Sequence, residues 1–202
     1  MECYVINNLG NGIVLLENFF TEKEYEMMWN ELEFLCEDDM LIDSKNVGGA
    51  VDPKTGQPLR VNRGVAIESV MDANNSDIVR LTRLIFEKQV IENLCNIDEM
   101  YHYLSYPTKE FNLVNHYMGG HKYDYHRDSC VITAITLFWK DPKLFTGGEL
   151  SFKSVTPKMK PRDMLLFPSY LLHAVSNVQL NEGVKPENMN GRISVSKFIK
   201  VA

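Results

Sequence analysis

The sequence predicts a mainly β fold, a sandwich or jelly roll, with helices covering one outer face of a sheet. The chain changes character near residue 105, with helical signals before it and strand signals after it. The second half consists of short runs separated by turn residues, a spacing typical of sandwiches and jelly rolls. The 202 residues are enough for one domain with a hydrophobic core. The predicted strands are 111–117, 123–127, 131–139, 148–153, 163–168, 173–178 and 191–201.

Two helices are predicted in the first half. Thr21 and Glu24 form a capping-box pattern at the start of the first helix. Apolar residues then follow at helical spacing. A second helix is predicted to start near Ser76 and to present an apolar side as far as Leu94. We therefore expect one domain over 1–202, with 1–105 as a helical N-terminal support that carries loop 43–65 and with 106–202 as the jelly-roll core.

The segment from Asp43 to Val65 lies between these helices and is rich in Gly, Asp, Asn and Lys. It predicts a long loop or a mobile hairpin, and loops of this length in compact domains often act as lids. Arg60, Asn62 and Arg63 could grip an incoming chain or an anionic group there. The alternative is a solvated excursion without a role.

Composition limits the class of protein. The net charge of −6 argues against binding nucleic acid mainly through phosphates, although a basic patch could lie around Lys158. No apolar run approaches the length of a membrane-spanning helix, and the N-terminus lacks the pattern of a secretory signal. The four cysteines form no C-x-x-C pair, so no zinc site or disulfide framework is predicted. Free thiols are typical of a reducing, cytoplasmic location.

The segment His126-Arg-Asp128 predicts a metal site. Residues i and i+2 of a strand point to the same side, so an imidazole and a carboxylate can reach one ion. His173 follows 47 residues after His126, at the start of a predicted strand. Two histidines and one carboxylate form the facial triad of non-haem iron(II) oxygenases. The triad leaves three positions open, two for a 2-oxo acid and one for dioxygen.

A cation for the far carboxylate of such a co-substrate is predicted at Arg192. In Gly-Arg192-Ile-Ser194-Val, Arg192 and Ser194 share one strand face, and the apolar residues between them face the opposite way. Arginine suits this role because it pairs with carboxylates through two hydrogen bonds. The alternatives are a surface ion pair for His126 and Asp128, a core histidine at His173, or a zinc-dependent hydrolase.

These segments resemble the 2-oxoglutarate- and iron(II)-dependent dioxygenases, in particular the small bacterial and phage members of the prolyl 4-hydroxylase-like branch. The resemblance covers about residues 111–200, and its segments occur in the order typical of the family. They are Asn115-His-Tyr117-Met-Gly-Gly, His126-Arg-Asp128, Thr146-Gly-Gly-Glu-Leu-Ser-Phe152, Asp163-Met-Leu-Leu-Phe-Pro-Ser169, His173-Ala-Val and Gly191-Arg192-Ile-Ser194.

The resemblance implies a double-stranded β-helix, a jelly-roll barrel. The resemblance implies that His126, Asp128 and His173 are the catalytic metal ligands. Arg192 would bind the distal carboxylate of the co-substrate with Ser194 beside it. Tyr117 would donate a hydrogen bond to the co-substrate, and Asn115 and Thr136 would face the pocket. The 19 residues from His173 to Arg192 exceed the usual spacing, so an inserted hairpin is expected over about 179–190.

The function implied is hydroxylation of an unactivated C–H bond, with iron(II), 2-oxoglutarate and dioxygen as cofactors and ascorbate as a further candidate. The favoured substrate is a peptide or protein, with a prolyl residue as the target. A nucleobase, a small metabolite or a non-catalytic binding module are the alternatives. No membrane partner is expected, a nucleic acid is less favoured, and the oligomeric state stays open.

Overall fold

A computed structural model describes residues 4–36, 40–186 and 189–201. Its strands and helices follow one another as β1 (Val5–Gly10), β2 (Ile13–Glu17), α1 (Glu22–Cys36), β3 (Ile42–Asp43), α2 (Ser44–Val47), β4 (Arg60–Val61), β5 (Arg63–Ala66), α3 (Asp77–Thr82), α4 (Lys88–Cys95), β6 (Lys109–Tyr117), β7 (Lys122–His126), β8 (Ile132–Phe138), β9 (Phe145–Thr146), β10 (Leu150–Phe152), β11 (Met164–Pro168), β12 (His173–Val175), β13 (Gln179–Leu180) and β14 (Arg192–Lys200). Short 3₁₀ turns connect several of them.

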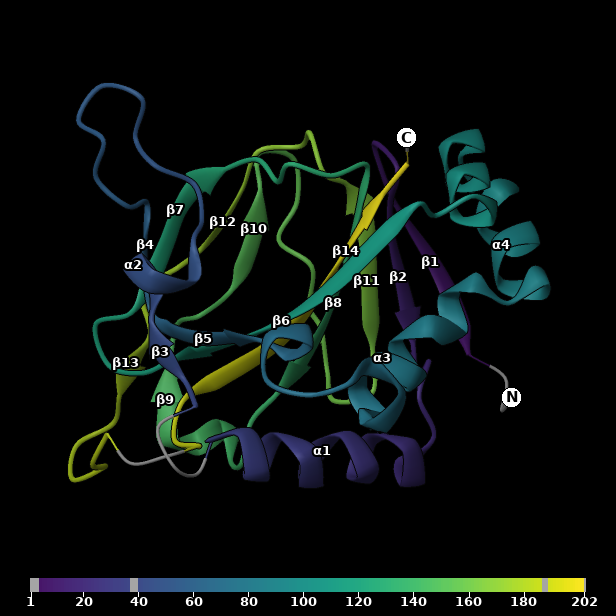
Figure 1. The fold of residues 1–202 in the computed structure, drawn as a ribbon. Helices are drawn as coiled ribbons and strands as arrows, with labels where there is room; N and C mark the ends of the chain where they lie inside the picture. Colours follow the sequence, from purple (N-terminus) through teal and green to yellow (C-terminus); the bar gives the residue numbers. More distant parts are fainter. Residues whose placement is uncertain (1–3, 37–39, 187–188, 202) are drawn as a thin grey trace.

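Two sheets form the body of the molecule, as the sequence predicts (Figure 1). The larger has the order β1-β2-β11-β8-β14-β6-β5-β3, and the smaller has the order β10-β12-β7-β4. Every pairing between these strands is antiparallel, which is typical of jelly rolls. Ladder hydrogen bonds do not close the two sheets into a continuous barrel within the described residues.

Strand alternation divides the core into two layers. On β14, Ile193 and Val195 belong to the apolar cluster shared with the helices, whose members include Met28 of α1 and Leu94 of α4. A second cluster contains inward-facing residues of both sheets: Leu15, Ile135, Leu137, Leu150, Phe152, Leu165, Phe167 and Val175. The helices therefore cover the outer face of the large sheet, and the second cluster lies between the two sheets.

The N-terminal hairpin adds two strands to the first half, where the sequence predicts helices and the loop or hairpin over 43–65. β1 and β2 pair with each other, and β2 extends the large sheet beside β11. The turn between them places Gly10, Asn11 and Gly12 at positive φ, a conformation that Gly and Asn adopt most readily. The Asn-Gly pair before the apolar run Ile13–Glu17 is the hairpin signal in the sequence.

The predicted helix starts are confirmed. The Thr21 amide donates to Glu24 Oε2 at 2.8 Å, and Thr21 Oγ1 accepts from the Glu24 amide at 3.2 Å. Ser76 Oγ accepts from the Val79 amide at 3.0 Å and caps α3. The second helix is broken into α3, a 3₁₀ turn and α4. Thr82 Oγ1 donates back to the Ile78 carbonyl at 2.8 Å, a bond that favours bending where α3 ends.

The segment 43–65 is built into both sheets more firmly than a free loop would be. β4 pairs with β7 of the small sheet, and β5 pairs with β6 of the large one. Only its tip, closed by the bridge between Val51 and Pro58, projects from the molecule (Figure 1). The segment therefore spans one edge of the space between the sheets.

The insertion expected over 179–190 begins as a strand, since β13 pairs with β9. Cys36, Cys95 and Cys130 are free thiols, and Cys3 lies outside the described residues. In the part of the chain that the structure describes, no helix has the length and apolar character to cross a membrane.

Candidate metal centre and co-substrate pocket

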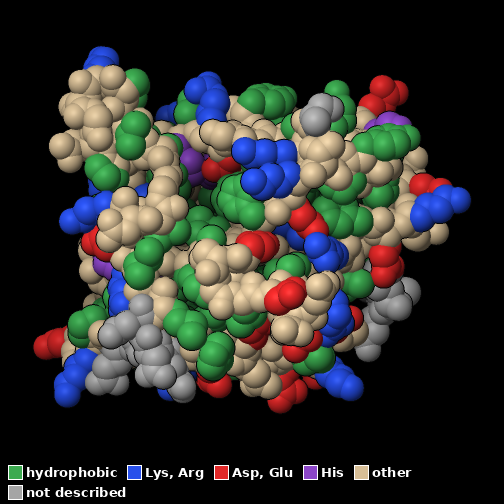
Figure 2. Space-filling view, viewed as in Figure 1, with side chains coloured by type: hydrophobic (Ala, Val, Ile, Leu, Met, Phe, Trp, Pro, Cys, Tyr) green, Lys and Arg blue, Asp and Glu red, His purple; other side chains and the backbone are tan. Residues whose placement is uncertain are grey.

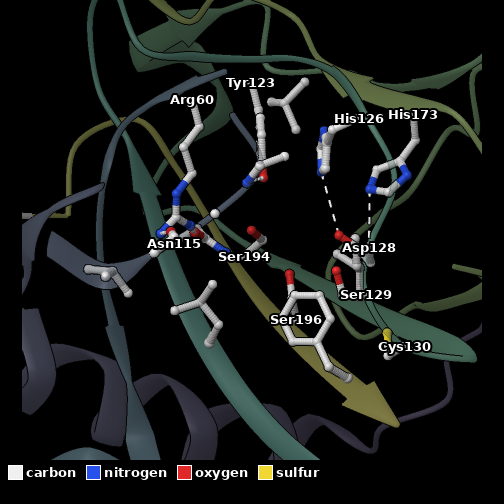
Figure 3. Close-up of a pocket in the computed structure, with 18 of the residues that line it drawn as sticks. Arg60, Asn115, Tyr123, His126, Asp128, Ser129, Cys130, His173, Ser194 and Ser196 are labelled. Carbon is white, nitrogen blue, oxygen red and sulfur yellow. Dashed lines mark hydrogen bonds and ion pairs between the residues drawn. The ribbon is translucent and has the colours of Figure 1, made fainter. Parts of the chain in front are cut away.

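The structure brings His126, Asp128 and His173 together between the sheets (Figure 3). His126 ends β7, His173 begins β12, and the two residues are paired in the antiparallel register. Asp128 Oδ1 lies 3.6 Å from His126 Nε2, and Asp128 Oδ2 lies 3.5 Å from His173 Nε2. Donor atoms at about 2.1 Å and at right angles around one ion lie about 3 Å apart, so the three side chains fit a shared metal ion.

Backbone carbonyls fix how both imidazoles face the centre. His126 Nδ1 donates to the Asp124 carbonyl at 2.9 Å, and His173 Nδ1 donates to the Leu171 carbonyl at 3.0 Å. Each Nε2 then carries a lone pair towards Asp128, the orientation that metal-binding histidines adopt. Burial, together with the nearby His173 and Arg60, lowers the pKa of His126 to about 3, although the bond to the Asp124 carbonyl raises it. His126 is therefore neutral, as a metal ligand must be.

Asp128 is held by a hydroxyl group. Thr133 Oγ1 on β8 donates to Asp128 Oδ2 at 2.7 Å and is itself bonded to Ser169 Oγ at 2.8 Å. Burial raises the pKa of the Asp128 carboxyl, whereas His173 and the Thr133 bond lower it. Cys130 Sγ lies 2.9 Å from Ser169 Oγ. Neither Thr133 nor Ser169 was predicted to be a site residue, although Thr133 lies in the predicted strand 131–139 and Ser169 directly follows the predicted strand 163–168.

A cavity of about 320 Å³ adjoins the three side chains and is lined from both sheets. Figure 2 shows histidine and acidic side chains recessed in a hollow on this face. The strand faces predicted to line the pocket do so: Asn115 and Tyr117 from β6, and Arg192 and Ser194 from β14. Thr136 is an exception, because alternation on β8 turns it to the helix side while Ile135 lines the cavity.

Arg192 is a buried cation without an ionic partner in the described residues. It is 2% exposed, and its Nε and Nη1 have no hydrogen-bond partner. Its guanidinium carbon lies 5.1 Å from the centroid of the Tyr117 ring, directly across the ladder. Gly148 makes room for it, since a Cβ there would lie 2.8 Å from Arg192 Cδ. A guanidinium with free N–H donors, in the same cavity as His126, Asp128 and His173, is suited to bind a carboxylate.

Tyr117 contributes a neutral hydroxyl to the same cavity. The side chain is 2% exposed, and burial raises its pKa to about 12, while Arg192 and Arg60 lower it. The phenol therefore keeps its proton at neutral pH and is able to donate a hydrogen bond to an anion.

Two further pocket residues were not assigned to the site from sequence. The Tyr123 ring stacks on His126 with centroids 3.4 Å apart, and its hydroxyl accepts from the Ala50 amide at 3.0 Å. Arg60, expected in a loop that could grip an incoming chain or an anionic group, is 3% exposed and donates to Asn115 Oδ1 at 3.0 Å. The position of Tyr123, three residues before His126, was a weak indication that it lies in the site, whereas nothing in the sequence near Arg60 indicated that its side chain is buried.

Comparisons with known proteins agree with this geometry. No family model matches the chain. A PKHD-type hydroxylase of Pseudoalteromonas atlantica is 24% identical over 183 residues, which covers 82% of this chain and 72% of that protein. A Pseudomonas putida prolyl 4-hydroxylase has a similar structure, with a TM-score of 0.63 at 14% identity over 95% of this chain and 94% of the other.

A 2-oxoglutarate–iron(II) oxygenase-family protein from Burkholderia pseudomallei has a TM-score of 0.57 at 12% identity, over 94% of this chain and 85% of that one. Both solved structures match nearly the whole chain, so the likeness extends beyond the segments that carry the sequence motifs. The resemblance inferred from the sequence is thereby confirmed: the chain is related to a PKHD-type hydroxylase and has the double-stranded β-helix fold of the 2-oxoglutarate- and iron(II)-dependent oxygenases.

Proposed function

We propose that the protein is an iron(II)- and 2-oxoglutarate-dependent hydroxylase whose iron is held by His126, Asp128 and His173. The observation that carries this proposal is the buried guanidinium of Arg192, unpartnered among the described residues and lining the same cavity as the three ligands. When bound, the metal with dioxygen supplies an oxidation that converts 2-oxoglutarate to succinate and carbon dioxide and hydroxylates a C–H bond. The protein supplies binding and orientation.

The three ligands are arranged for a metal with open positions. Two imidazoles and one carboxylate bind on one side of an ion and leave the opposite side for the co-substrate and dioxygen. The backbone carbonyls of Asp124 and Leu171 hold the imidazoles in the ligating tautomer. The Thr133 hydroxyl holds Asp128 with its second oxygen towards His173. Such outer contacts strengthen metal binding by keeping the ligands oriented.

Arg192, Tyr117 and Ser194 form the proposed site for the far carboxylate of 2-oxoglutarate. Arg192 contributes free N–H donors and a positive charge, and Tyr117 contributes a neutral hydroxyl. Ser194 is 3% exposed and lines the same wall. A carboxylate bound there would pair the buried charge, which removes a cost that the free protein bears.

For the substrate we propose a peptide with a prolyl target, which the similarity to a prolyl 4-hydroxylase supports. A nucleobase is less favoured, because the protein carries a net charge of −6. A small metabolite of the same class is the second candidate. The cavity of about 320 Å³ supports it, since that volume is at the lower end of the range for small-molecule pockets.

The test is formation of succinate from 2-oxoglutarate under air, with iron(II) added or chelated, across peptides, amino acids and nucleosides. We expect slow, iron-dependent succinate formation without substrate and faster formation with the correct one, and ascorbate should sustain the slow reaction. Iron-independent hydrolysis of any panel member would favour a zinc-type hydrolase. Absence of both activities in protein that binds metal would favour a binding module.

A further inference from the structure

A second buried guanidinium, that of Arg60, lies across the cavity from the metal ligands. Figure 3 shows Arg60 beside Asn115 on one side of the pocket and the three ligands on the other. Arg60 begins β4, opposite Tyr123 of β7, and is 3% exposed. Its Nη1 donates to Asn115 Oδ1 at 3.0 Å, and its Nη2 donates to the Gly48 carbonyl and, at 3.5 Å, to the Ser44 carbonyl.

All three of these acceptors are neutral. No carboxylate among the described residues pairs with Arg60, and its Nε has no hydrogen-bond partner. Arginine keeps its proton in proteins, so the charge is buried without a counterion. Burying an unpaired charge is costly, and the cost falls when an anion enters. Arg60 therefore has a free donor and an unbalanced charge beside the cavity.

The cavity as a whole is cationic, in a protein whose net charge is −6. The described residues that line it include Arg60, Arg127, Arg192 and Lys200, whereas Asp128 is the only acidic one. Charged clefts concentrate ligands of the opposite sign. Asp128 alone does not balance these positive charges, so we expect this cavity to select a negatively charged ligand.

The co-substrate alone does not provide the balance, if the proposed function is correct. Arg127 is exposed and Lys200 is half-buried, so the balance is drawn for the buried charges. A divalent metal and Arg192 together carry three positive charges. Asp128 and the two carboxylates of 2-oxoglutarate carry three negative ones. The charge of Arg60 is left over, and the substrate is the remaining molecule that has to enter.

We propose that Arg60 binds a carboxylate of the substrate, so that the substrate is a free amino acid or a peptide that carries an acidic residue near its target. A carboxylate is the anion that fits best, because its planar oxygens match a guanidinium and the cavity is small. Arg60 also holds the Gly48 carbonyl, and residues 47–50 line the cavity. Its position therefore connects substrate binding to the 43–65 segment.

The experiment compares acids with their neutral amides. Each standard L-amino acid is paired with its C-terminal amide, and blocked proline-containing peptides with Glu are paired with the same peptides with Gln. Binding to the protein loaded with Mn(II) and 2-oxoglutarate is measured by calorimetry, and stimulation of succinate formation is measured with iron(II). The variants are Arg60→Gln and Arg60→Lys. Arg80→Gln is the control, because it removes the same charge from an exposed α3 residue paired with Asp77.

We expect the wild type to bind at least one acid about 10- to 100-fold more tightly than its amide, the usual range for a charge-assisted bond. Arg60→Gln should bring the acid to the level of the amide, Arg60→Lys should keep part of the preference, and Arg80→Gln should keep all of it. Arg80→Gln should also leave the KM for 2-oxoglutarate in the substrate-free reaction unchanged. Should Arg60→Gln fail to fold, the acid-to-amide ratio of the wild type and the Arg60→Lys variant still decide.

Equal binding of acids and amides, or binding of neither, would overturn the proposal. A raised KM for 2-oxoglutarate in Arg60→Gln with an unchanged preference would assign Arg60 to the co-substrate and would also overturn it. The free amino acids and the Glu peptides distinguish the two sources of the carboxylate. Failure of the proposed function has a different signature, because the wild type would then form no succinate under any condition.

Discussion

Replacing Arg192 by Met should weaken 2-oxoglutarate binding while leaving the free protein as stable as the wild type or more stable. The side chain is 2% exposed, and two of its nitrogens have no hydrogen-bond partner. Met keeps most of the apolar stem that packs near Gly148 and Val178 and removes only the charge. Burial already lowers the pKa of Arg192, so the charged form is costly in the free protein.

The magnitudes follow from the two unpartnered nitrogens. A hydrogen bond to a charged group is worth about 1.5–3 kcal/mol, so losing two should raise the KM for 2-oxoglutarate about 100-fold or more. Replacing buried charges by apolar residues of similar volume is often neutral or stabilising by about 1–4 kcal/mol. In a domain of this size each kcal/mol shifts the Tm by about 2–4 °C. The substrate-free succinate reaction and thermal unfolding of the metal-free protein measure the two effects.

A co-substrate role for Arg192 predicts a raised KM for 2-oxoglutarate together with an unchanged or raised Tm. A structural arginine that stabilises the fold would give a large fall in Tm and little change in KM. That result would refute the assignment of Arg192 to the co-substrate. Arg162→Met is a control, because Arg162 is a half-buried arginine that does not line the cavity and whose guanidinium donates to Asn18 Oδ1 at 2.8 Å.

Three further predictions concern the metal centre, pH and the edge segment. Thr133→Val should weaken Mn(II) or Zn(II) binding about 10- to 100-fold by calorimetry, and Thr133→Ser should restore it; equal affinities would show that the bond to Asp128 does not matter. Burial lowers the pKa of His116 from 6.5 to about 4, so its contribution to stability is complete above pH 6.5 and is lost as the pH falls towards 4. His116→Gln should therefore flatten the fall in unfolding free energy by up to about 1.4 kcal/mol per pH unit in that window, measured by urea titration; an unchanged slope would contradict it. Residues 43–65 should gain hydrogen-exchange protection only when substrate and co-substrate are both bound, and identical exchange in all states would reject a lid.

The second half of the fold was predictable because its signals are local. Strand alternation, turn residues and the i, i+2 relation of His126 and Asp128 depend on neighbours in the chain. The strands confirmed there differ from the predicted runs mainly at their ends. The same alternation explains the opposite outcomes for Ser194 and Thr136. Each position follows from the register of its strand, and the prediction for Thr136 was wrong because β8 points Ile135 inward instead.

The elements of the first half were less predictable because tertiary contacts decide them. Ile13–Glu17 is a short apolar run of a kind that fits a strand or a buried helix segment equally well. Its pairing with β11, far along the chain, selects the strand. The helix after Ser76 breaks where the Thr82 hydroxyl bonds back to Ile78, and the same Oγ1 lies 3.0 Å from Asn112 Oδ1 of β6. Asn112 lies on β6, and the apolar pattern of the helix gives no information about where that strand packs.

Arg60 illustrates why part of the site was beyond the reach of sequence patterns. Its neighbours are polar and turn-forming, and such composition normally indicates exposure. The side chain is buried because β4 and β5 bridge the two sheets and bring Arg60 to Asn115, 55 residues away. Asn115 in turn lies opposite Ser194 on β14, next to Arg192. A residue from a polar segment thus reaches the same wall as the proposed co-substrate residues, and only the long-range pairing reveals that the two buried guanidiniums share one cavity.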